Sequence, residues 1–430
     1  DPATGMSLGQ ALMGPQHMLK LTHQIDKKVS VRSGMFGPGA PEKYDLNLMP
    51  ASGGKTGGQS MGNLGMYTLL AHGARANIRE MQTWKSEGMD SAHDSKRWRA
   101  QHDDVWKSIQ TGDPFPTPKH TFAFEKFVSM LKAAGVNVEK KGNRMQLLPL
   151  TDQQVLAMST GALTKPAALT SVKLDDDGKP MPIKGGLFDP KITGGHDGKK
   201  WSHFELAEPM PNPVFESAIK RVLGLTGKQY DSLVVSDQAL DPSSGKFVPV
   251  GTKGSLTGGP AIAHMLKKLD IPQELKKAHS ELNSVKAPLG DAQLSYNQSG
   301  QPRNTQKLDA AFKKVKYLNA LNEAGMTAED AYTIKNLPVI PPAMRPASVL
   351  PDGSVRWADL NGLYSELASL NEQMKDPRYK DMLGDKTKRD SRAGLYDGVK
   401  ALMGVGASYT DRKDKNKGLL LQLAGPYPKE

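Results

Sequence analysis

A glycine-rich segment near the start of the chain combines residue types that could do chemistry. Gly54-Lys55-Thr56 matches the end of a phosphate-binding loop, but that loop needs a glycine five positions before its Gly-Lys pair, where Met49 stands. Gly58-Gln-Ser-Met-Gly62 has the spacing of a serine nucleophile elbow, which also needs a buried apolar strand before the serine. Glycine, lysine and threonine precede it instead. The segment therefore predicts a flexible loop that directs Lys55 toward a phosphate backbone, and a serine hydrolase acting through Ser60 is kept as an alternative.

The residue types that bind metals do not form a recognisable site. The ten histidines include no His-Glu-x-x-His motif and no pair four residues apart, and Asp175-Asp-Asp-Gly178 lacks the alternating ligands of a calcium loop. The chain has no cysteine, which excludes disulfides, thiolate zinc sites and a cysteine nucleophile. We therefore predict no metal site and no catalytic residue in this chain.

Basic residues are in excess, and this excess indicates a class of partner. Lysine and arginine total 57 against 45 aspartate and glutamate, which gives a formal net charge of +12 and a pI near 9.4. Such a balance favours a polyanion, with nucleic acid the first choice and an anionic membrane surface the second. The run from Arg412 to Lys417 is the densest basic stretch near the end of the chain. No apolar run approaches the roughly 20 residues that span a bilayer.

Length and hydrophobic spacing predict the elements that must position these residues. The 430 residues predict two or three domains, and the 37% hydrophobic content excludes wholesale disorder. Apolar residues recur at helical spacing from Leu64 to Trp84, and in a firm helix over 309–324 whose apolar face is Leu308, Phe312, Val315, Leu318 and Leu321. We also expect helices over 122–134, 218–225 and 261–269, a capped helix over 151–160 with Asp152 in its first turn, and a hairpin over 136–150.

A proline cluster precedes the most regular apolar stripe. Residues 337–346 include four prolines and must be extended, because proline fixes φ and displaces its predecessor from the α region. After it, Leu360, Leu363, Leu367, Leu370 and Met374 recur at spacings of three and four. Pro377 ends this stripe, and Leu395, Val399 and Leu402 resume it. The pattern predicts an antiparallel helical hairpin within an α+β, multi-domain fold.

Two series of blocks go beyond what composition and spacing establish. The first series is Met6-Ser-Leu-Gly-Gln10, Met18 to Lys28, Val31-Arg-Ser33, Gly53-Gly-Lys, Gly57-Gly-Gln, Ala71-His-Gly-Ala74 and Lys85-Ser86. The second series is Lys184-Gly-Gly-Leu-Phe-Asp-Pro-Lys-Ile-Thr-Gly194, His203-Phe-Glu-Leu-Ala-Glu-Pro209, Leu337-Pro-Val-Ile-Pro-Pro with Arg345-Pro346, and Trp357-Ala-Asp-Leu-Asn-Gly-Leu-Tyr364. The first resembles the late part of the β subunit of multisubunit DNA-dependent RNA polymerase, and the second resembles the start of its β′ subunit.

This resemblance implies an irregular polymerase clamp and hybrid-binding architecture, with the helical hairpin as the clamp helices. It divides the chain into 1–110, a β-like hybrid-binding and clamp-anchor region; 111–336, a β′-like clamp region; 337–359, the proline motif and lid; 360–404, the clamp hairpin; and 405–430, a rudder-like segment. The expected function is template-dependent RNA synthesis, as part of a DNA-directed RNA polymerase (a nucleotidyltransferase). The expected nucleic-acid contacts are Lys20, His23, Lys28, Arg32, Lys55, Arg345, Arg356, Lys413, Lys415 and Lys417.

Three departures from the family shape these expectations. His196 to Lys200 stands where the family carries a cysteine zinc ribbon, so no zinc is expected. The clamp-helix region has Ser369 to Lys375 in place of an arginine-rich face, so a specificity factor is only an optional partner. The catalytic Asn-Ala-Asp-Phe-Asp-Gly-Asp motif does not occur, so the Mg²⁺ of the full polymerase is expected outside this chain. We expect a phage-like fusion of β and β′ parts and, because the chain begins at Asp1, a piece of a longer protein.

The expected partners are the DNA template, the RNA–DNA hybrid and the remaining parts of the polymerase, with no membrane. The expected location is the cytoplasm, that of a bacterial host if the gene belongs to a phage. The alternative function is a non-catalytic nucleic-acid-binding scaffold derived from a polymerase.

Overall fold

The structure is a computed structural model that describes residues 3–5, 7, 9, 14–19, 61–82, 104–116, 122–142, 144–166, 182–286, 305–349, 355–376, 385–406 and 416–424. Helices and strands are mixed along this part of the chain, which confirms the predicted α+β class. No helix in these ranges is both long enough and apolar enough to span a lipid bilayer.

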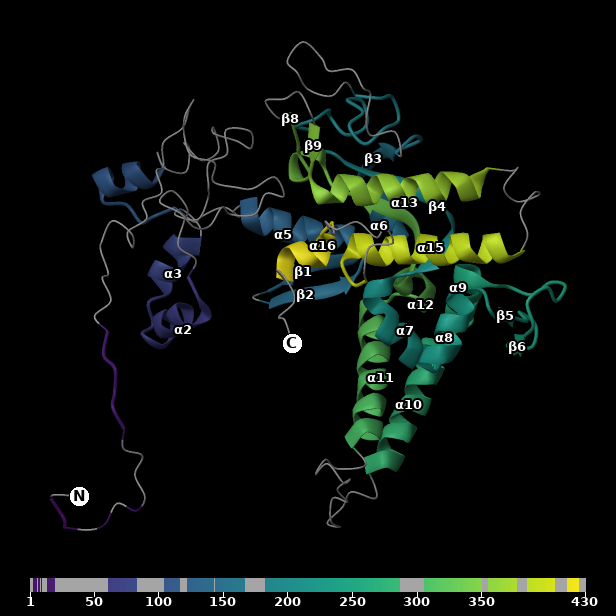
Figure 1. Ribbon diagram of the computed structural model, residues 1–430, viewed down its shortest axis with the longest axis horizontal. Helices are drawn as coiled ribbons and strands as arrows, with labels where there is room; N and C mark the ends of the chain where they lie inside the picture. Colours follow the sequence, from purple (N-terminus) through teal and green to yellow (C-terminus); the bar gives the residue numbers. More distant parts are fainter. Residues whose placement is uncertain are drawn as a thin grey trace.

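The largest sheet among the described residues has three strands. Its order is β3 (Ser159–Ala162), β4 (Trp201–Pro211) and β7 (Thr333–Val339), with β3 parallel and β7 antiparallel to β4. Of these strands, β3 and β4 are labelled in Figure 1. The β4–β7 register shifts between Glu205 and Met210, so β4 bulges away from its partner there. This bulge leaves backbone groups of β4 available to neighbouring helices.

After residue 116, the described residues also form eleven α-helices and three short two-stranded ladders. The helices are α5 (Phe122–Ala133), α6 (Asp152–Met158), α7 (Glu216–Leu223), α8 (Gly227–Val234), α9 (Gly258–Lys267), α10 (Ile271–Lys286), α11 (Thr305–Ala324), α12 (Ala328–Tyr332), α13 (Asp359–Lys375), α15 (Asp385–Met403) and α16 (Leu419–Ala424). Of these helices, α5, α6, α9, α12 and α13 pack against the sheet. The ladders pair β1 (Val136–Lys141) with β2 (Arg144–Pro149), β5 (Ala239–Leu240) with β6 (Phe247–Val248), and β8 (Ala347–Val349) with β9 (Val355–Trp357). These bounds confirm the helices predicted over 122–134, 218–225, 261–269 and 309–324, and the hairpin over 136–150.

One hydrophobic core runs through these elements. It extends from Met130 in α5 to Leu419 in α16, and includes Phe204 of β4, Ile262 of α9 and Tyr364 of α13. Residues of four of the five predicted segments, those beyond residue 110, contribute to it. The described elements of these four segments therefore share one core.

The helix predicted from Leu64 to Trp84 is broken in the structure. It forms α2 (Asn63–Ala71) and α3 (Arg75–Gln82), separated at Gly73, whose φ of 73° lies in the left-handed region that glycine adopts without strain. Leu64 and Tyr67 are 81% and 66% exposed, so the apolar stripe covers no core among the described residues. The prediction of one continuous amphipathic helix was wrong because the glycine ended it.

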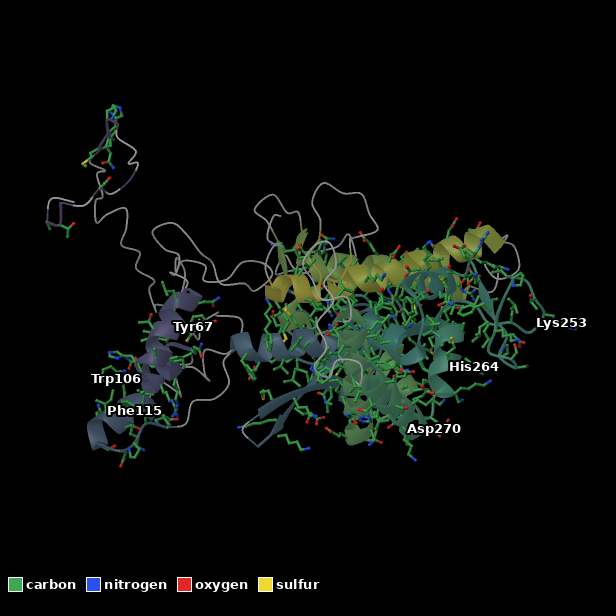
Figure 2. All side chains as sticks on the ribbon, turned by 90° about the horizontal axis from the view of Figure 1, so that it is seen from below. Tyr67, Trp106, Phe115, Lys253, His264 and Asp270 are labelled. Atoms are coloured by element: carbon green, nitrogen blue, oxygen red, sulfur yellow. The ribbon has the colours of Figure 1, made fainter. Side chains whose placement is uncertain are left out.

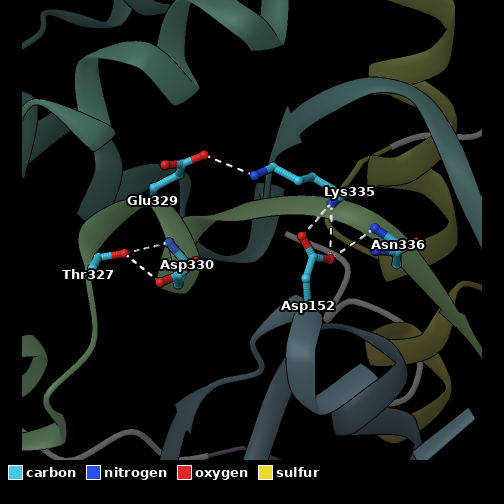
Figure 3. Close-up of polar contacts among 6 residues, drawn as sticks. All are labelled: Asp152, Thr327, Glu329, Asp330, Lys335 and Asn336. Carbon is cyan, nitrogen blue, oxygen red and sulfur yellow. Dashed lines mark hydrogen bonds and ion pairs between the residues drawn. The ribbon is translucent and has the colours of Figure 1, made fainter. Parts of the chain in front are cut away.

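The capped helix predicted at residue 151 is confirmed and protects a sheet edge. Thr151 and Gln154 form a reciprocal capping box at the start of α6. Asp152, in the first turn, accepts hydrogen bonds from the backbone N–H groups of Lys335 (3.2 Å) and Asn336 (2.9 Å) in β7 (Figure 3). Its carboxylate thus occupies edge groups of β7 that would otherwise be open to another strand.

The predicted helical hairpin corresponds to α13 and α15, which lie side by side (Figure 1). Leu363 and Leu367 of α13 and Val399 and Leu402 of α15 are at most 3% exposed and belong to the common core. The helix α13 ends at Lys375, as the position of Pro377 predicted, although Pro377 itself lies outside the described residues.

Candidate nucleic-acid interface

Arg345 was predicted to contact nucleic acid, and the structure gives it a different role. Its side chain is fully buried. Its guanidinium donates from Nε to the carbonyl of Ile340 (2.8 Å), from Nη1 to Oδ1 of Asn361 (2.8 Å) and from Nη2 to the carbonyl of Leu187 (2.6 Å). Asn361 in turn donates from Nδ2 to the carbonyl of Arg345 (2.8 Å). The prediction is corrected: this arginine binds three protein segments and offers no donor at the surface.

Aromatic side chains close the same cluster, here called the Arg345 hub. The guanidinium lies 4.9 Å from the ring centre of Phe188. His196 stacks on Phe188 with ring centres 4.8 Å apart, and Trp357 packs on it at 5.7 Å. The hub thereby joins residues 185–196, the proline motif and the start of α13. Burial lowers the pKa of Arg345 to about 10. Because this value is still well above 7, the guanidinium stays charged at neutral pH.

Tyr364 completes the attachment of α13 to the proline motif. Its hydroxyl donates to the carbonyl of Pro338 (3.2 Å) and accepts from the backbone N–H of Ile340 (3.4 Å). Burial raises its pKa to about 12, so the hydroxyl remains protonated and able to donate. The start of α13 is therefore fixed to β7 by hydrogen bonds as well as by apolar packing.

The turn that stands in place of a zinc ribbon is closed by its own backbone. Within residues 193–200, Gly198 donates to the carbonyl of Gly195 (3.1 Å), and Lys200 donates to that of Thr193 (3.4 Å). A Cβ on Gly198 would lie 1.8 Å from the Thr193 carbonyl oxygen, so no other residue fits this approach. Ala343, from the proline motif, donates to the Gly198 carbonyl at 3.0 Å. No group of three or more metal-ligating side chains occurs among the described residues.

The bulge of β4 is the second point where distant elements meet. Asn371 of α13 accepts from the Ala207 backbone N–H (2.7 Å) and donates to the Glu205 carbonyl (2.9 Å), replacing the missing partner strand. Arg392 of α15 pairs with Glu208 at 2.9 Å and donates to the Thr257 hydroxyl at 2.6 Å. The hairpin is thus bound to β4 through both of its helices.

The segment predicted as a lid forms the β8–β9 ladder. Arg356, a predicted contact, lies in β9 opposite Ser348 of β8. Ala358, just after β9, donates to the carbonyl of Pro346 (3.1 Å), which closes the base of the ladder above the hub. The ladder therefore starts and ends on the segments that Arg345 holds.

Of the remaining predicted nucleic-acid contacts, one lies within the described residues and seven lie outside them. Lys417 is exposed, and its backbone N–H donates to Oδ2 of Asp359 at the start of α13 (3.1 Å). Lys20, His23, Lys28, Arg32, Lys55, Lys413 and Lys415 lie outside the described residues, as do the glycine-rich segment with Ser60 and the Asp175 run. Only Arg345, Arg356 and Lys417 lie within the described residues. Arg345 begins the 345–361 region, while Arg356 and Asp359, the partner of Lys417, lie near its end.

Sequence reasoning missed one serine–histidine pair. Oγ of Ser159 in β3 lies 2.7 Å from Nδ1 of His203 in β4. Burial lowers the pKa of His203, against the opposing influence of Glu205 and Asp152. The Ser159 hydroxyl also bonds the backbone of Gly161, at 3.1 and 3.3 Å, so this pair ties the parallel strands together. The parallel pairing brought the two residues together, and no spacing in the sequence predicts that.

An open pocket of about 330 Å³ lies beside α9 and the start of α10. Its wall includes Leu240, Met265, His264, Lys268 and Asp270; His264 and Asp270 are labelled in Figure 2. The carbonyl of Pro242 accepts from Lys268 and lies 3.3 Å from Nε2 of His264, so the basic groups of this wall are directed at the protein itself. We assign no ligand to this pocket.

Comparison with known proteins relates part of this chain to the RNA polymerase family. No family model matches it. A protein of Enterococcus faecium named DNA-directed RNA polymerase subunit beta is 31% identical over 170 residues, covering 38% of this chain and 13% of that protein. Proteins of the same name from Christiangramia forsetii and Leuconostoc mesenteroides are 34% and 32% identical over 142 residues, covering 32% of this chain and 10% of each protein. The chain thus spans between 10% and 13% of the length of these relatives.

Proposed function

We propose that this chain is part of a DNA-directed RNA polymerase and contributes clamp, lid, rudder and RNA–DNA hybrid contacts to template-dependent RNA synthesis. The observation that carries the proposal is the identity of about a third to the polymerase β subunit over roughly a third of the chain. The remaining polymerase parts, the template and the hybrid are its proposed partners. A specificity factor on α13 and α15 is a further, optional partner.

The Arg345 hub supports the β′-like half of the proposal. The four blocks that resemble β′ stand far apart in the sequence, yet the hub, the β4–β7 pairing and the Asn371 contacts bring all four together. Residues that specify one packing arrangement are expected to occur together in a related protein. A phage-like fusion of β and β′ parts is therefore the arrangement we propose for this chain.

The magnesium ions of such a polymerase are proposed to be held by other parts of the enzyme. Metal-assisted nucleotidyl transfer needs clustered carboxylates, and the described residues contain no such group. Asp152 and Asp189, two well-placed carboxylates, both accept backbone N–H groups instead. The contribution of this chain is therefore binding and positioning of nucleic acid.

The test measures binding of a labelled RNA–DNA hybrid to the purified chain. Fluorescence anisotropy gives the affinity at several salt concentrations. Each phosphate neutralised by lysine or arginine releases counterions, so the logarithm of affinity should fall linearly with the logarithm of salt, by about 0.9 per contact. Absence of binding at roughly 50 mM salt, where electrostatic association is strong, would overturn the proposal.

The scaffold alternative is equally compatible with the described residues, which contain no cluster of metal-ligating side chains, and a different observation separates it from the polymerase. The coding sequence downstream of Glu430 either continues into Asp-Phe-Asp-Gly-Asp or stops. Continuation identifies a polymerase chain, whereas a stop codon together with hybrid binding and no association with other polymerase parts identifies a non-catalytic scaffold.

A further inference from the structure

We propose that the arm formed by α10 and α11 binds single-stranded nucleic acid, with Phe312 as a stacking platform for a base and the neighbouring lysines as phosphate contacts. The proposal rests on the nucleic-acid function proposed above and assigns it an additional surface. None of the contacts expected from the family resemblance lies on this arm.

The arm is a two-helix projection in which α10 and α11 pack side by side (Figure 1). The inner faces of α10 and α11 are filled by Ala278, Leu282, Val315 and Leu318, each at most 6% exposed. Lys314 of α11 bonds Glu281 of α10 at 3.3 Å and lies 4.0 Å from Glu274, about two helical turns earlier in α10. The two helices are therefore held in one register, and their outer faces are fixed surfaces.

The acidic side chains of the arm are largely neutralised. Glu274 pairs with Lys277 at 2.8 Å, and Asp309 pairs with Lys313 at 2.8 Å. In contrast, Lys276, Lys307 and Lys316 are exposed and make no ion pair with any described residue. The arm thus presents unpaired positive charges, which suit a polyanion.

Phe312 is the unexpected residue on this surface. The spacing of apolar residues predicted that it would face the core with Val315, Leu318 and Leu321, but its side chain is 56% exposed. Lys316 follows Phe312 by four residues in α11, about one helical turn, so the two side chains share a side of the helix. An exposed aromatic ring beside an unpaired lysine, on an arm that carries further unpaired lysines, has the composition of surfaces on which bases stack while the phosphates meet cations.

The geometry favours a single strand over a duplex. Stacking on Phe312 requires the face of an unpaired base, which a duplex hides inside its own stack. Lysine contacts alone would bind both forms. A preference for single strands that depends on Phe312 is therefore the property that separates this proposal from general electrostatic attraction.

The experiment compares the whole chain with its Phe312→Ala variant. The probes are a fluorescent oligothymidylate of about 12 nucleotides and an abasic strand of equal length and charge. We expect the variant to bind oligothymidylate roughly 5- to 100-fold more weakly, the range that loss of one stacked base produces, and the abasic strand as before. Phe312→Tyr, which keeps a ring, should bind like the original chain.

Two further variants identify the electrostatic part. Lys316→Glu should weaken binding of both strands and lower the slope of log affinity against log salt by about one. Lys253→Glu, an equal charge change on the exposed loop after β6 (Figure 2), should leave the preference for bases unchanged. Circular dichroism of each variant verifies that the helices persist.

A crosslinking measurement tests the contact directly when several surfaces bind at once. An oligonucleotide containing iodouracil reacts under light with a stacked aromatic side chain, and mass spectrometry should find the adduct at Phe312. Equal binding of oligothymidylate by Phe312→Ala, or adducts confined to other residues, would overturn the arm proposal while hybrid binding kept the proposed function. If the chain binds no nucleic acid at low salt, both proposals fail.

Discussion

Arg345 illustrates how a single residue can resemble a ligand contact and act as a structural one. Its planar guanidinium provides donors in fixed directions, and the structure uses these on carbonyls of Ile340 and Leu187 and on the amide of Asn361. A lysine has one compact donor group and reproduces no such fork. Replacement would therefore leave buried acceptors unpaired.

We expect Arg345→Lys to lower the free energy of unfolding by about 3 to 5 kcal/mol, the usual cost of disrupting a buried charged network. Urea denaturation monitored by tryptophan fluorescence measures it. Nucleic-acid binding by the folded fraction should stay within twofold. A variant that is stable but has lost nucleic-acid binding would instead support the predicted contact between Arg345 and nucleic acid.

Glu216 is the centre of a second residue-scale network, which ties α15 to α7 and α8. Its carboxylate lies 2.6 Å from Nζ of Lys220 and 3.2 Å from Nζ of Lys400. The hydroxyl of Tyr396 donates to it at 3.3 Å and lies 2.9 Å from that of Tyr230. Burial alone would raise the pKa of Glu216, but the two lysines outweigh burial and lower it.

This lowered pKa predicts a dependence of stability on pH. A carboxyl group with a lower pKa in the folded state stabilises the fold above its unfolded pKa, and the contribution is lost as the pH falls through the folded value. Stability should therefore decline as the pH falls below about 4.5, the unfolded value. Glu216→Gln should cost about 1 to 3 kcal/mol at pH 7 and flatten this part of the profile. An unchanged profile in thermal unfolding would contradict the assignment.

At the scale of elements, the contact between α13 and α15 tolerates only small or apolar side chains at several positions. Gly398 of α15 passes so close to Leu367 of α13 that a Cβ would lie 2.9 Å from the leucine Cδ1. Leu367 and Val399 are both fully or almost fully buried there. A charge at either position would have no partner in the seam.

Leu367→Asp or Val399→Asp should therefore cost more than about 4 kcal/mol and separate the hairpin from the sheet. Loss of helical signal in circular dichroism and earlier thermal unfolding would report it. Lys388→Glu changes a charge on the same pair of helices, at a lysine that makes no ion pair with any described residue. It is the matched control and should unfold like the original chain. Tolerance of either aspartate would exclude this packing.

At the scale of the whole molecule, the shared core predicts cooperative unfolding. Core residues from Met130 to Leu419 form one cluster that draws on four of the five predicted segments. Two partly buried tryptophans, Trp201 and Trp357, pack against this cluster. We therefore expect far-UV circular dichroism and tryptophan fluorescence to give coincident main transitions. Two well-separated main transitions would indicate that the predicted segments unfold independently.

Local chemistry in the sequence was sufficient for many elements. The Thr151 cap, the position of α11, the end of α13 before Pro377 and the β1–β2 hairpin all depend on residues within a few positions of one another, so spacing and propensity predict them. The helix α10 carried a comparable signal, since Ile271, Leu275, Ala278 and Leu282 recur at spacings of four and three, and it was overlooked.

The family blocks were also legible in the sequence, but the use of their side chains was decided by the tertiary structure. Whether Arg345 faces solvent depends on Leu187 and Asn361, which are distant in the sequence and reach it only through the fold. Phe312 lies on a helix whose partner covers only part of the apolar stripe, and Ser159 meets His203 only through parallel strand pairing. Periodicity determines which face of a helix is apolar, whereas burial requires another element to cover that face.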